Sequence, residues 1–215
     1  VSSISWVTQS LFQVYSGVSR AVIATTDPAG LVLVYRYDGQ TNIPVNAGTY
    51  NVRATVDDPI YEGSVTGILM VSKANPTLLF PNPGDQWTTN MVALTPSSDS
   101  PEAIQLSVVS GPAVLQGATL TFTNAGVVEL AAHQSEGANW NAASSNISFT
   151  VRKAVAPVII FGTNQVYGGT PRVVTVSTIP VGLAVDITYD GGTNPPVNAG
   201  DATVVAAIDA AEPMY

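Results

Sequence analysis

Residues 13–58 read QVYSGVSRAVIATTDPAGLVLVYRYDGQTNIPVNAGTYNVRATVDD, and residues 165–210 read QVYGGTPRVVTVSTIPVGLAVDITYDGGTNPPVNAGDATVVAAIDA. The two stretches align without a gap and are identical at half of their positions. Self-similarity at this level indicates a repeat architecture in which each copy folds as one unit. The chain of 215 residues is therefore expected to form an array of small modules.

The residues that the two copies share are mainly those that make turns. Glycine reaches positive φ without steric cost, and proline fixes φ at about −65°. The shared turn residues are Gly17 with Gly169, Pro28 with Pro180, Gly30 with Gly182, Asp38-Gly39 with Asp190-Gly191, and Asn46-Ala47-Gly48 with Asn198-Ala199-Gly200. Because such residues specify chain reversals, their repetition indicates a shared fold and says little about binding.

Short apolar or alternating segments between these turns predict β-strands. The expected strands are 20–26, 31–37, 49–56 and 67–72, and later 104–109, 118–123, 127–133 and 147–152. No window has the 3.6-residue period of a helix, so we expect almost no helix. Six or seven short strands per unit predict an all-β fold of tandem small immunoglobulin-like β-sandwich modules.

A different unit separates the two copies. It ends in SFTVRKA, which echoes the ILMVSKA near the end of the first unit. We therefore divide the chain into a first repeat (residues 1–74), a middle module (75–154) and a last repeat (155–215). The joints between them are short and contain Pro76 and Pro157, which stiffen an extended chain. The expected arrangement of the modules is an elongated rod.

The last repeat has no counterpart of EGSVTGILMVSKA, residues 62–74 of the first repeat. It is therefore expected to lack its last strand, which would leave a sheet edge or groove open. Two explanations remain open at this point. The parent chain continues beyond this segment, or another chain supplies the strand, as in assembly by strand complementation.

Composition and charge exclude several classes of partner. Charged residues make up 10% of the chain, and the net charge is −8 with five Arg and two Lys. Such a chain has no basic surface for nucleic acid or for anionic lipid. No apolar run approaches the ~20 residues of a membrane helix, so membrane insertion is not expected within this segment. Cysteine is absent, which excludes disulfides and thiolate sites.

Several motifs carry a family resemblance. The first repeat contains RYDG, then PVNAGTY, then DDPIYEGSVTGILMVSKA, and the last repeat contains TYDG and PVNAG. This series resembles the MBG-type repeat domains of large bacterial surface proteins, and GANWNAASSNISFTVRKA resembles the end of a related Ig-like module. The resemblance implies an extracellular or cell-surface protein, and it implies no catalytic residues.

Candidate catalytic residues are few. His133 is the only histidine, and no GxSxG elbow accompanies it, so no catalytic triad is predicted. Asp57 and Asp58 are the only adjacent carboxylates, and their position before Pro59 favours a turn over catalysis. We therefore predict no enzyme activity and no catalytic site.

Calcium is the one ion for which the sequence offers ligands. Hard oxygen donors from loops can gather at a junction between modules. The candidates are Asp57, Asp58 and Glu62 in the first repeat, and Asp209 and Glu212 in the last. They are not clustered in sequence, no DxDxDG-like loop is present, and no other cofactor is expected.

Tryptophans and lysines are the remaining candidate residues. Trp6 and Trp140 are expected to pack in a core or joint, whereas Trp87, in GDQWTT, is expected in a loop where it could stack on a sugar ring. Lys73 and Lys153 stand at the joints, which argues against buried isopeptide crosslinks.

Two functions follow from these features. The first is an extracellular spacer or fibre-forming segment of a bacterial surface protein, whose partners are neighbouring modules or copies of itself. The alternative is an adhesive or carbohydrate-binding module for a cell-surface glycan or protein.

Overall fold

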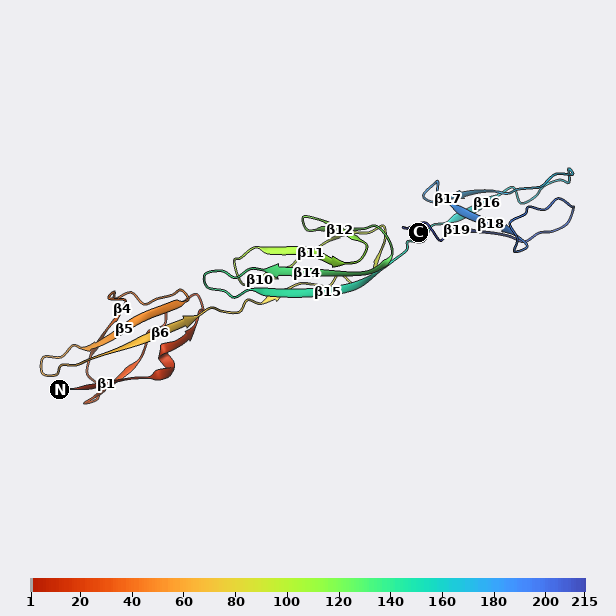
Figure 1. Ribbon diagram of the computed structural model, residues 1–215. Helices are drawn as coiled ribbons and strands as arrows, with labels where there is room; N and C mark the ends of the chain where they lie inside the picture. Colours follow the sequence, from red (N-terminus) through yellow and green to blue (C-terminus); the bar gives the residue numbers. More distant parts are fainter. Residues whose placement is uncertain (1) are drawn as a thin grey trace. The chain divides into compact units, whose positions relative to one another are not determined.

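The computed structural model describes residues 2–215, and almost all of their regular structure is β-strand (Figure 1). The exception is a four-residue 3-10 helix, Thr8–Leu11. The strands form several small sheets, most of them antiparallel. The predicted all-β fold is confirmed, and the rod arrangement of the modules stays a prediction.

Two compact units divide the chain. The first contains the residues up to Phe80 together with Pro96–Gln105 and Ala132–Ser145. The second contains Pro81–Thr95, Leu106–Ala131 and Asn146–Tyr215. The first repeat thus shares a unit with part of the middle module, and the last repeat shares a unit with the rest. The three predicted module boundaries stay a prediction.

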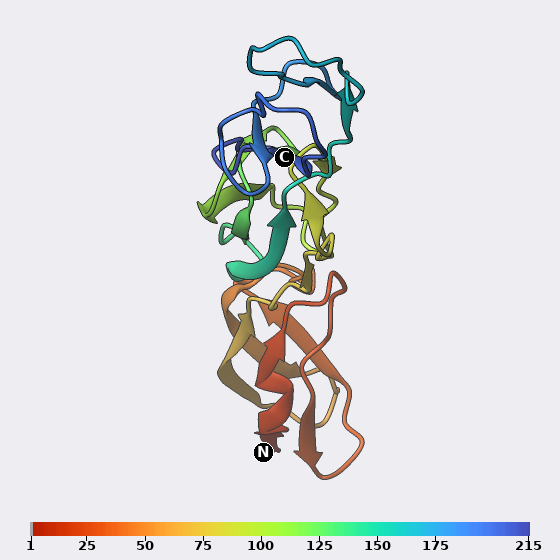
Figure 2. The ribbon, with the colours of Figure 1, turned by 90° about the vertical axis from the view of Figure 1, so that its right-hand side faces the viewer.

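Two sheets form the first repeat. A two-stranded antiparallel sheet pairs β1 (Ser3–Trp6) with β3 (Ala24–Asp27). A four-stranded sheet has the order β2-β6-β5-β4, in which β2 is Phe12–Val14, β6 is Ser64–Ser72, β5 is Gly48–Val56 and β4 is Leu33–Tyr37. β6 is parallel to β2 and antiparallel to β5. Figures 1 and 2 show this sheet from two directions.

Strand alternation builds the core of the first repeat. Side chains alternate between the two faces of a strand, so every second residue of β5 and β6 points inward. Val52, Leu69 and Val71 are buried in this way, and Leu69 is only 1% exposed. Burying one such side chain contributes about 1.5–3 kcal/mol. β6 therefore supplies two of the main core side chains. Partly buried side chains around them are Trp6, Leu11, Tyr15, Tyr35 and Tyr50.

A buried tyrosine holds the segment before β3. The N–H of Val22 donates to the hydroxyl of Tyr37 at 3.2 Å, and both residues are buried. The next N–H, of Ile23, donates to the hydroxyl of Ser10. The N–H groups of this segment are thus bonded to side-chain hydroxyls, and not to the backbone of a neighbouring strand. The predicted strand at 20–26 is wrong for residues 20–23, and β3 begins only at Ala24.

The last repeat has the same local geometry as the first. Val174 donates its N–H to the hydroxyl of Tyr189 at 3.0 Å, as Val22 does to Tyr37. After each tyrosine an Asp-Gly pair has positive φ at both residues, as a type I′ turn requires. The carboxylate of Asp38 or Asp190 accepts a hydrogen bond of 2.8 Å from the backbone 13 residues later. The repeated turn residues therefore make repeated turns.

The sheets of the last repeat are smaller. β16 (Val158–Phe161) pairs with β17 (Thr175–Thr178), and β18 (Val185–Tyr189) pairs with β19 (Val204–Ile208). These pairs correspond to β1 with β3 and to β4 with β5. Within the described residues, β19 pairs with β18 alone.

The middle module contains nine short strands. One sheet has the order β11-β14-β15-β8, a second β12-β13-β9, and a third pairs β10 with β7. Their bounds are β7 Leu78–Leu79, β8 Gln86–Trp87, β9 Met91–Ala93, β10 Ser97–Ser98, β11 Ile104–Ser110, β12 Ala113–Gln116, β13 Thr119–Phe122, β14 Gly126–Gln134 and β15 Ala143–Arg152. The four strands predicted for this module are present, and β15 starts four residues earlier than expected. Phe122 and Phe149 meet edge to face in its core, with ring centroids 6.1 Å apart.

Replacing Tyr37 by Phe should destabilise the first repeat. The variant leaves the buried N–H of Val22 without its acceptor, which costs about 1–3 kcal/mol. The measurement is urea unfolding together with amide exchange at Val22. Tyr167→Phe, at an exposed tyrosine, is the control and should leave both unchanged.

The same variant should change the response to alkali. Burial raises the pKa of Tyr37 above its ordinary value, so the folded state favours the protonated phenol. This contribution to the free energy of unfolding is present below about pH 10 and is lost as the pH rises above that value. Tyr37→Phe should remove this loss, and an unchanged alkaline profile would contradict the assignment.

Candidate functional site

The first joint is a backbone pairing between Ala74 and the loop around Trp140. The N–H of Ala74 donates to the carbonyl of Asn139 at 2.9 Å, and its carbonyl accepts from the N–H of Asn141 at 2.8 Å. Ala74 and Trp140 therefore form a parallel β-bridge within the first compact unit. The joint is an extension of sheet-type hydrogen bonding and not a free linker.

Asn139 also binds the Asn-Ala-Gly turn of the first repeat. Its side-chain carbonyl accepts the N–H of Ala47 at 2.8 Å, and its amide donates to the side-chain oxygen of Asn46 at 3.1 Å. The sequence predicts only a turn at Asn46-Ala47-Gly48. Its use as a contact for Asn139 was not foreseen, because the partners lie 92 residues apart in sequence.

An aromatic contact and an ion pair complete this joint. Tyr15 meets Trp140 edge to face, with ring centroids 5.7 Å apart. The ammonium of Lys73 forms a salt bridge with the carboxylate of Glu136. The predicted joint packing of Trp140 is confirmed, and Lys73 is engaged with a carboxylate.

A second joint lies in the other compact unit. The N–H of Ala154 donates to the carbonyl of Met214 at 2.9 Å, and Thr88 donates its hydroxyl to the same carbonyl. The ammonium of Lys153 donates to the carbonyls of Ala210 and Glu212. Both joint lysines thus have polar partners.

Three of the five proposed calcium ligands accept hydrogen bonds from backbone N–H groups. The carboxylate of Asp58 accepts the N–H groups of Ile60 and Tyr61, at 2.8 and 3.0 Å. The carboxylate of Asp209 accepts one N–H, and that of Glu212 accepts the N–H of Ala184 at 2.9 Å. The first three candidates lie in one compact unit and the other two in the other. Among residues 2–215, no group of three or more acidic or histidine side chains is placed to hold a metal ion.

His133 and Trp6 each contact nearby groups of the fold. A ring nitrogen of His133 lies 3.1 Å from the hydroxyl of Ser144 on the exposed face of β14 and β15. Trp6 packs against the core of the first repeat, as predicted, and its indole N–H donates to the carbonyl of Thr66.

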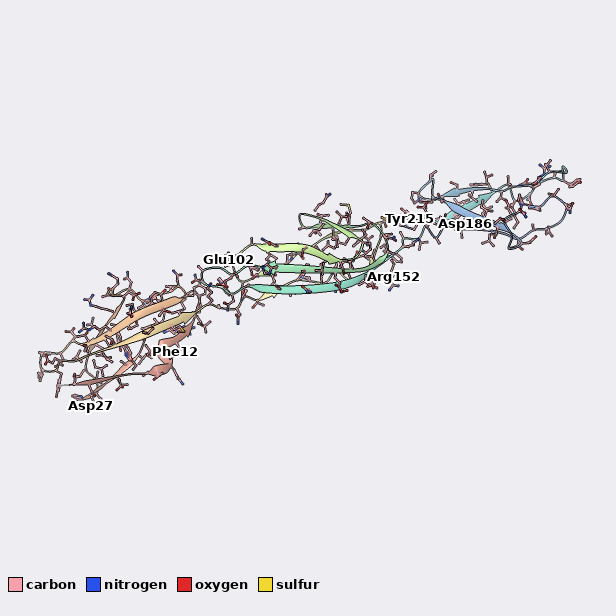
Figure 3. The ribbon with its side chains drawn as sticks, in the orientation of Figure 1. Phe12, Asp27, Glu102, Arg152, Asp186 and Tyr215 are labelled. Atoms are coloured by element: carbon pink, nitrogen blue, oxygen red, sulfur yellow. The ribbon has the colours of Figure 1, made fainter. Side chains whose placement is uncertain are left out.

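Trp87 lies on a strand and not, as the sequence predicts, in a loop. It belongs to β8, where it pairs with Arg152. Figure 3 labels Arg152, the last residue of β15. Asp85 forms a salt bridge of 2.8 Å with Arg152. Strand partners project from the same face of a sheet, and the indole of Trp87 is 47% exposed on that face. The hydrogen bond from Arg152, and then that from the Thr150 N–H, lowers the pKa of Asp85, which stays ionised at neutral pH.

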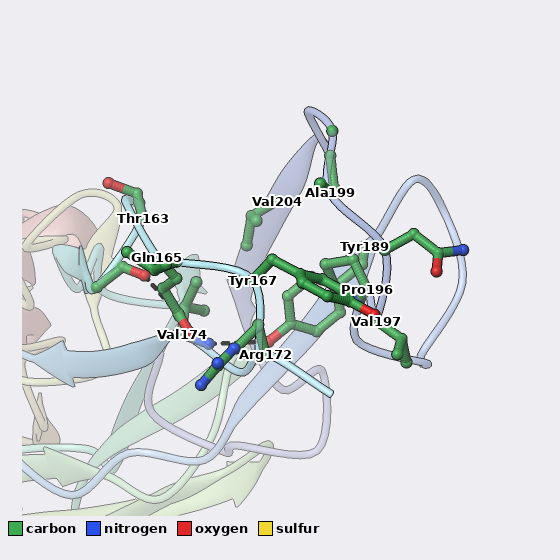
Figure 4. A pocket seen from close by; sticks show the side chains of 15 residues that line it. Thr163, Gln165, Tyr167, Arg172, Val174, Tyr189, Pro196, Val197, Ala199 and Val204 are labelled. Carbon is green, nitrogen blue, oxygen red and sulfur yellow. Dashed lines mark hydrogen bonds between the residues drawn. The ribbon is translucent and has the colours of Figure 1, made fainter. Parts of the chain in front are cut away.

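The last repeat contains an open groove, bounded by residues 162–167 on one side and 200–204 on the other. The groove encloses about 180 Å³ (Figure 4). Val174 and Tyr189 form part of its lining. Tyr167, the counterpart of Tyr15, is 64% exposed at its rim.

Family comparison identifies both repeats. The MBG domain model matches residues 7–75 and 156–212, which together make up more than half of the chain. The chain belongs to the MBG domain family. The resemblance of the MBG motifs seen in the sequence is thereby confirmed for both repeats.

Two solved structures are similar to this MBG-domain chain. One is human protocadherin-24 EC1-2, at 12% identity and a TM-score of 0.32, covering 72% of this chain and 99% of that one. The other is a SusE-like surface-located polysaccharide-binding protein from the heparin utilisation locus of Bacteroides thetaiotaomicron. It has 14% identity and a TM-score of 0.24, and the match covers 70% of this chain and 34% of that one. No curated protein matches. Among residues 2–215 there is no helix with the length and apolar character to cross a membrane.

Replacing Asn139 by Ala should loosen the first joint. The change removes the side-chain acceptor of the Ala47 N–H and the donor to Asn46, at a cost of about 1 kcal/mol. A loss of that size corresponds to about fivefold faster exchange of the Ala47 amide, which NMR can follow residue by residue. Ser135→Ala, in the same exposed loop, is the control. Equal exchange in both variants would show that Asn139 does not hold the turn.

Proposed function

We propose that the chain is a structural segment of a bacterial surface protein, located outside the cell, where it acts as a spacer or as part of a fibre. The observation that supports this role best is the first joint. Ala74 is bonded on both its N–H and its carbonyl to the loop of the adjoining module. A spacer needs joints that keep its modules in a set order and spacing, and a paired backbone meets that need better than a flexible linker.

The second joint supports the same role. The carbonyl of Met214 accepts from both Ala154 and Thr88, so the end of the last repeat is bonded to the strand region that precedes it. Two different joints are thus made from hydrogen bonds to backbone groups. The chain belongs to the MBG family, and its motifs resemble those of the MBG-type repeats of large bacterial surface proteins. This likeness supports the cell-surface location.

A role without catalysis is part of the proposal. The carboxylates of Asp58 and Asp209 accept backbone N–H groups in their own turns, and that of Glu212 accepts the N–H of Ala184. Within the described chain, a ring nitrogen of His133 lies within hydrogen-bond distance of the Ser144 hydroxyl. These side chains therefore form hydrogen bonds within the protein itself.

Small-angle X-ray scattering tests the spacer role directly. Three sandwich modules in a row, each about 30–40 Å long, should give a maximum dimension of about 100 Å. A compact globule of this length would have a radius of gyration of about 17 Å. A measured radius close to that value would contradict an extended spacer. Asn139→Ala should increase the spread of dimensions without unfolding the modules.

A second candidate function is glycan binding at Trp87. The exposed indole belongs to the strand partner of Arg152, whose guanidinium forms a salt bridge with the carboxylate of Asp85. An aromatic face next to hydrogen-bonding groups is a surface on which a sugar ring can stack.

Glycan-array binding separates this candidate from the spacer role. If Trp87 binds sugar, Trp87→Ala should abolish the array signal and Trp87→Phe should retain part of it, because the phenyl ring keeps a stacking face. Met91→Ala is the matched control, since Met91 is another exposed apolar residue and is 74% exposed. Binding that survives Trp87→Ala would exclude the site.

A further inference from the structure

Two arginines face each other on the four-stranded sheet of the first repeat. Arg36 of β4 and Arg53 of β5 are direct strand partners, and both are exposed. Side chains of direct partners start about 5 Å apart on one face of a sheet, and like charges placed in this way repel each other. The chain has seven Lys and Arg residues in all, so this pair concentrates two of its few cationic side chains at one place.

The last repeat shows that the fold does not need this pair. Its counterparts of Arg36 and Arg53 are Thr188 and Val205, which are also direct partners, in β18 and β19. The same two strands therefore pair with neutral side chains at this position. The repulsion between the arginines is thus a cost that strand pairing does not explain.

No carboxylate forms a salt bridge with the pair in the part of the chain that the structure describes. The two salt bridges found there join other side chains. Asp38, two residues after Arg36, directs its carboxylate to Asn51 and accepts the backbone N–H at 2.8 Å and the side-chain amide at 3.1 Å. Glu62 lines a neighbouring hollow together with Arg53. The charge of the two guanidinium groups is therefore not neutralised by a direct partner among residues 2–215.

Each guanidinium keeps most of its donors for an outside acceptor. An arginine side chain has five N–H donors. Nη1 of Arg36 donates to the carbonyl of Gly39, and Nη2 of Arg53 donates to the hydroxyl of Ser64, both at 3.2 Å. Within the described residues these are the hydrogen bonds of the two side chains, so further N–H groups remain for a ligand.

The pair lines a hollow on the exposed face of β4, β5 and β6, which we call the arginine hollow. Its other polar side chains are Asn51 and Thr66, and Ile68, which is 56% exposed, gives it an apolar patch. The hollow encloses about 700 Å³. Ligand pockets typically have volumes of about 300–1,000 Å³. The arginine hollow is therefore large enough for one or a few units of a chain-like ligand.

A ligand in the arginine hollow meets side chains and not free backbone groups. β5 and β6 are inner strands of the sheet, each paired on both sides. Their N–H and carbonyl groups are bonded to neighbouring strands, so an extended peptide cannot add to them as a further strand. The chemistry of the side chains therefore decides what binds.

These side chains match a sugar that carries an anionic group. The planar guanidinium fork binds the paired oxygens of carboxylates and similar oxyanions. The amide N–H of Asn51 is bonded to Asp38, so its side-chain oxygen can accept from a sugar hydroxyl, and the Thr66 hydroxyl can donate or accept. The side chain of Ile68 offers an apolar surface for the C–H groups of a sugar ring. An acidic peptide would use the arginines alone, so this set of groups favours a glycan.

From these observations we infer that the arginine hollow binds a polysaccharide whose sugar rings carry carboxylate or sulfate groups. Arg36 and Arg53 bind one anionic group between them, which offsets their mutual repulsion, and Asn51 and Thr66 bind neighbouring hydroxyls. The chain has a net charge of −8 and repels polyanions in general, so binding depends on this pair. The site goes beyond the spacer role, and it is separate from Trp87, which lies in the other compact unit.

Calorimetric titration of the whole 215-residue chain tests the inference. The probes are alginate oligosaccharides, which carry carboxylates, and dextran sulfate, which carries sulfates. At least one of them should bind, and comparing the two identifies the anionic group. Binding should weaken as salt is added, because salt screens exposed charges. Neutral dextran and poly-glutamate of similar length are the controls and should bind weakly or not at all.

A double variant takes its residues from the last repeat. Arg36→Thr with Arg53→Val should weaken binding at least about tenfold, because a hydrogen bond to a charged group contributes about that factor or more. Its melting temperature should stay the same or rise, since the repulsion is removed and both new residues favour strands. Arg20→Ala, at an exposed arginine outside the hollow, is the control and should bind normally.

A second double variant separates charge from geometry. Arg36→Lys with Arg53→Lys keeps the net charge and both cations but replaces the planar forks by single ammonium groups. It should bind more weakly than the unaltered chain and more tightly than the Thr and Val variant.

Several results would overturn the inference. They are absence of binding by both anionic polysaccharides, equal binding of neutral dextran, or unchanged binding by the Thr and Val variant. A clear fall in the melting temperature of that variant would show that the arginines serve the sheet itself. Equal binding of poly-glutamate would identify an acidic protein as the partner, and loss of binding in Trp87→Ala would place the site at β8. None of these outcomes bears on the scattering test of the spacer role, so the two proposals can fail separately.

Discussion

A backbone N–H that is buried must find an acceptor, and in both repeats a tyrosine hydroxyl provides it. Tyr37 accepts from Val22, and Tyr189 accepts from Val174. Each tyrosine ends a strand and is followed at once by the Asp-Gly turn, so one side chain connects the strand, the turn and the segment before β3 or β17. The bond thus joins the segment that leads into one sheet of each repeat to the last residue of a strand in the other.

The sequence predicts the strands and turns of the repeats well, because alternation and turn residues act over short distances. It fails where a side chain replaces a strand partner. Residues 20–23 have a strand-like pattern, but Tyr37 and Ser10 take their N–H groups. The residues around Trp87 are typical of a loop, yet pairing with β15, more than 60 residues later, makes it part of a strand. Asn139 could not be chosen as a joint residue, since its partners Asn46 and Ala47 are distant in sequence.

For the carboxylates, residue type alone leaves several roles open. Asp57 and Asp58 are adjacent and acidic, so composition alone permits a cation or a catalytic role. The position before Pro59 predicts a turn, and the two N–H groups bonded to Asp58 agree with that prediction. The turn predicted at Pro59 is therefore present, and the carboxylate of Asp58 takes part in it. The residues that line the groove of the last repeat, in contrast, are brought together only in three dimensions.

The bonds on both sides of Ala74 have a mechanical consequence. Asn75 and Pro76 form the covalent link to the middle module, but the hydrogen bonds of Ala74 to Asn139 and Asn141 run alongside that link. A pulling force along the chain must break these bonds before the short link can straighten. The joint thus behaves as a clamp with a threshold load, and below that load the distance between its two sides stays constant.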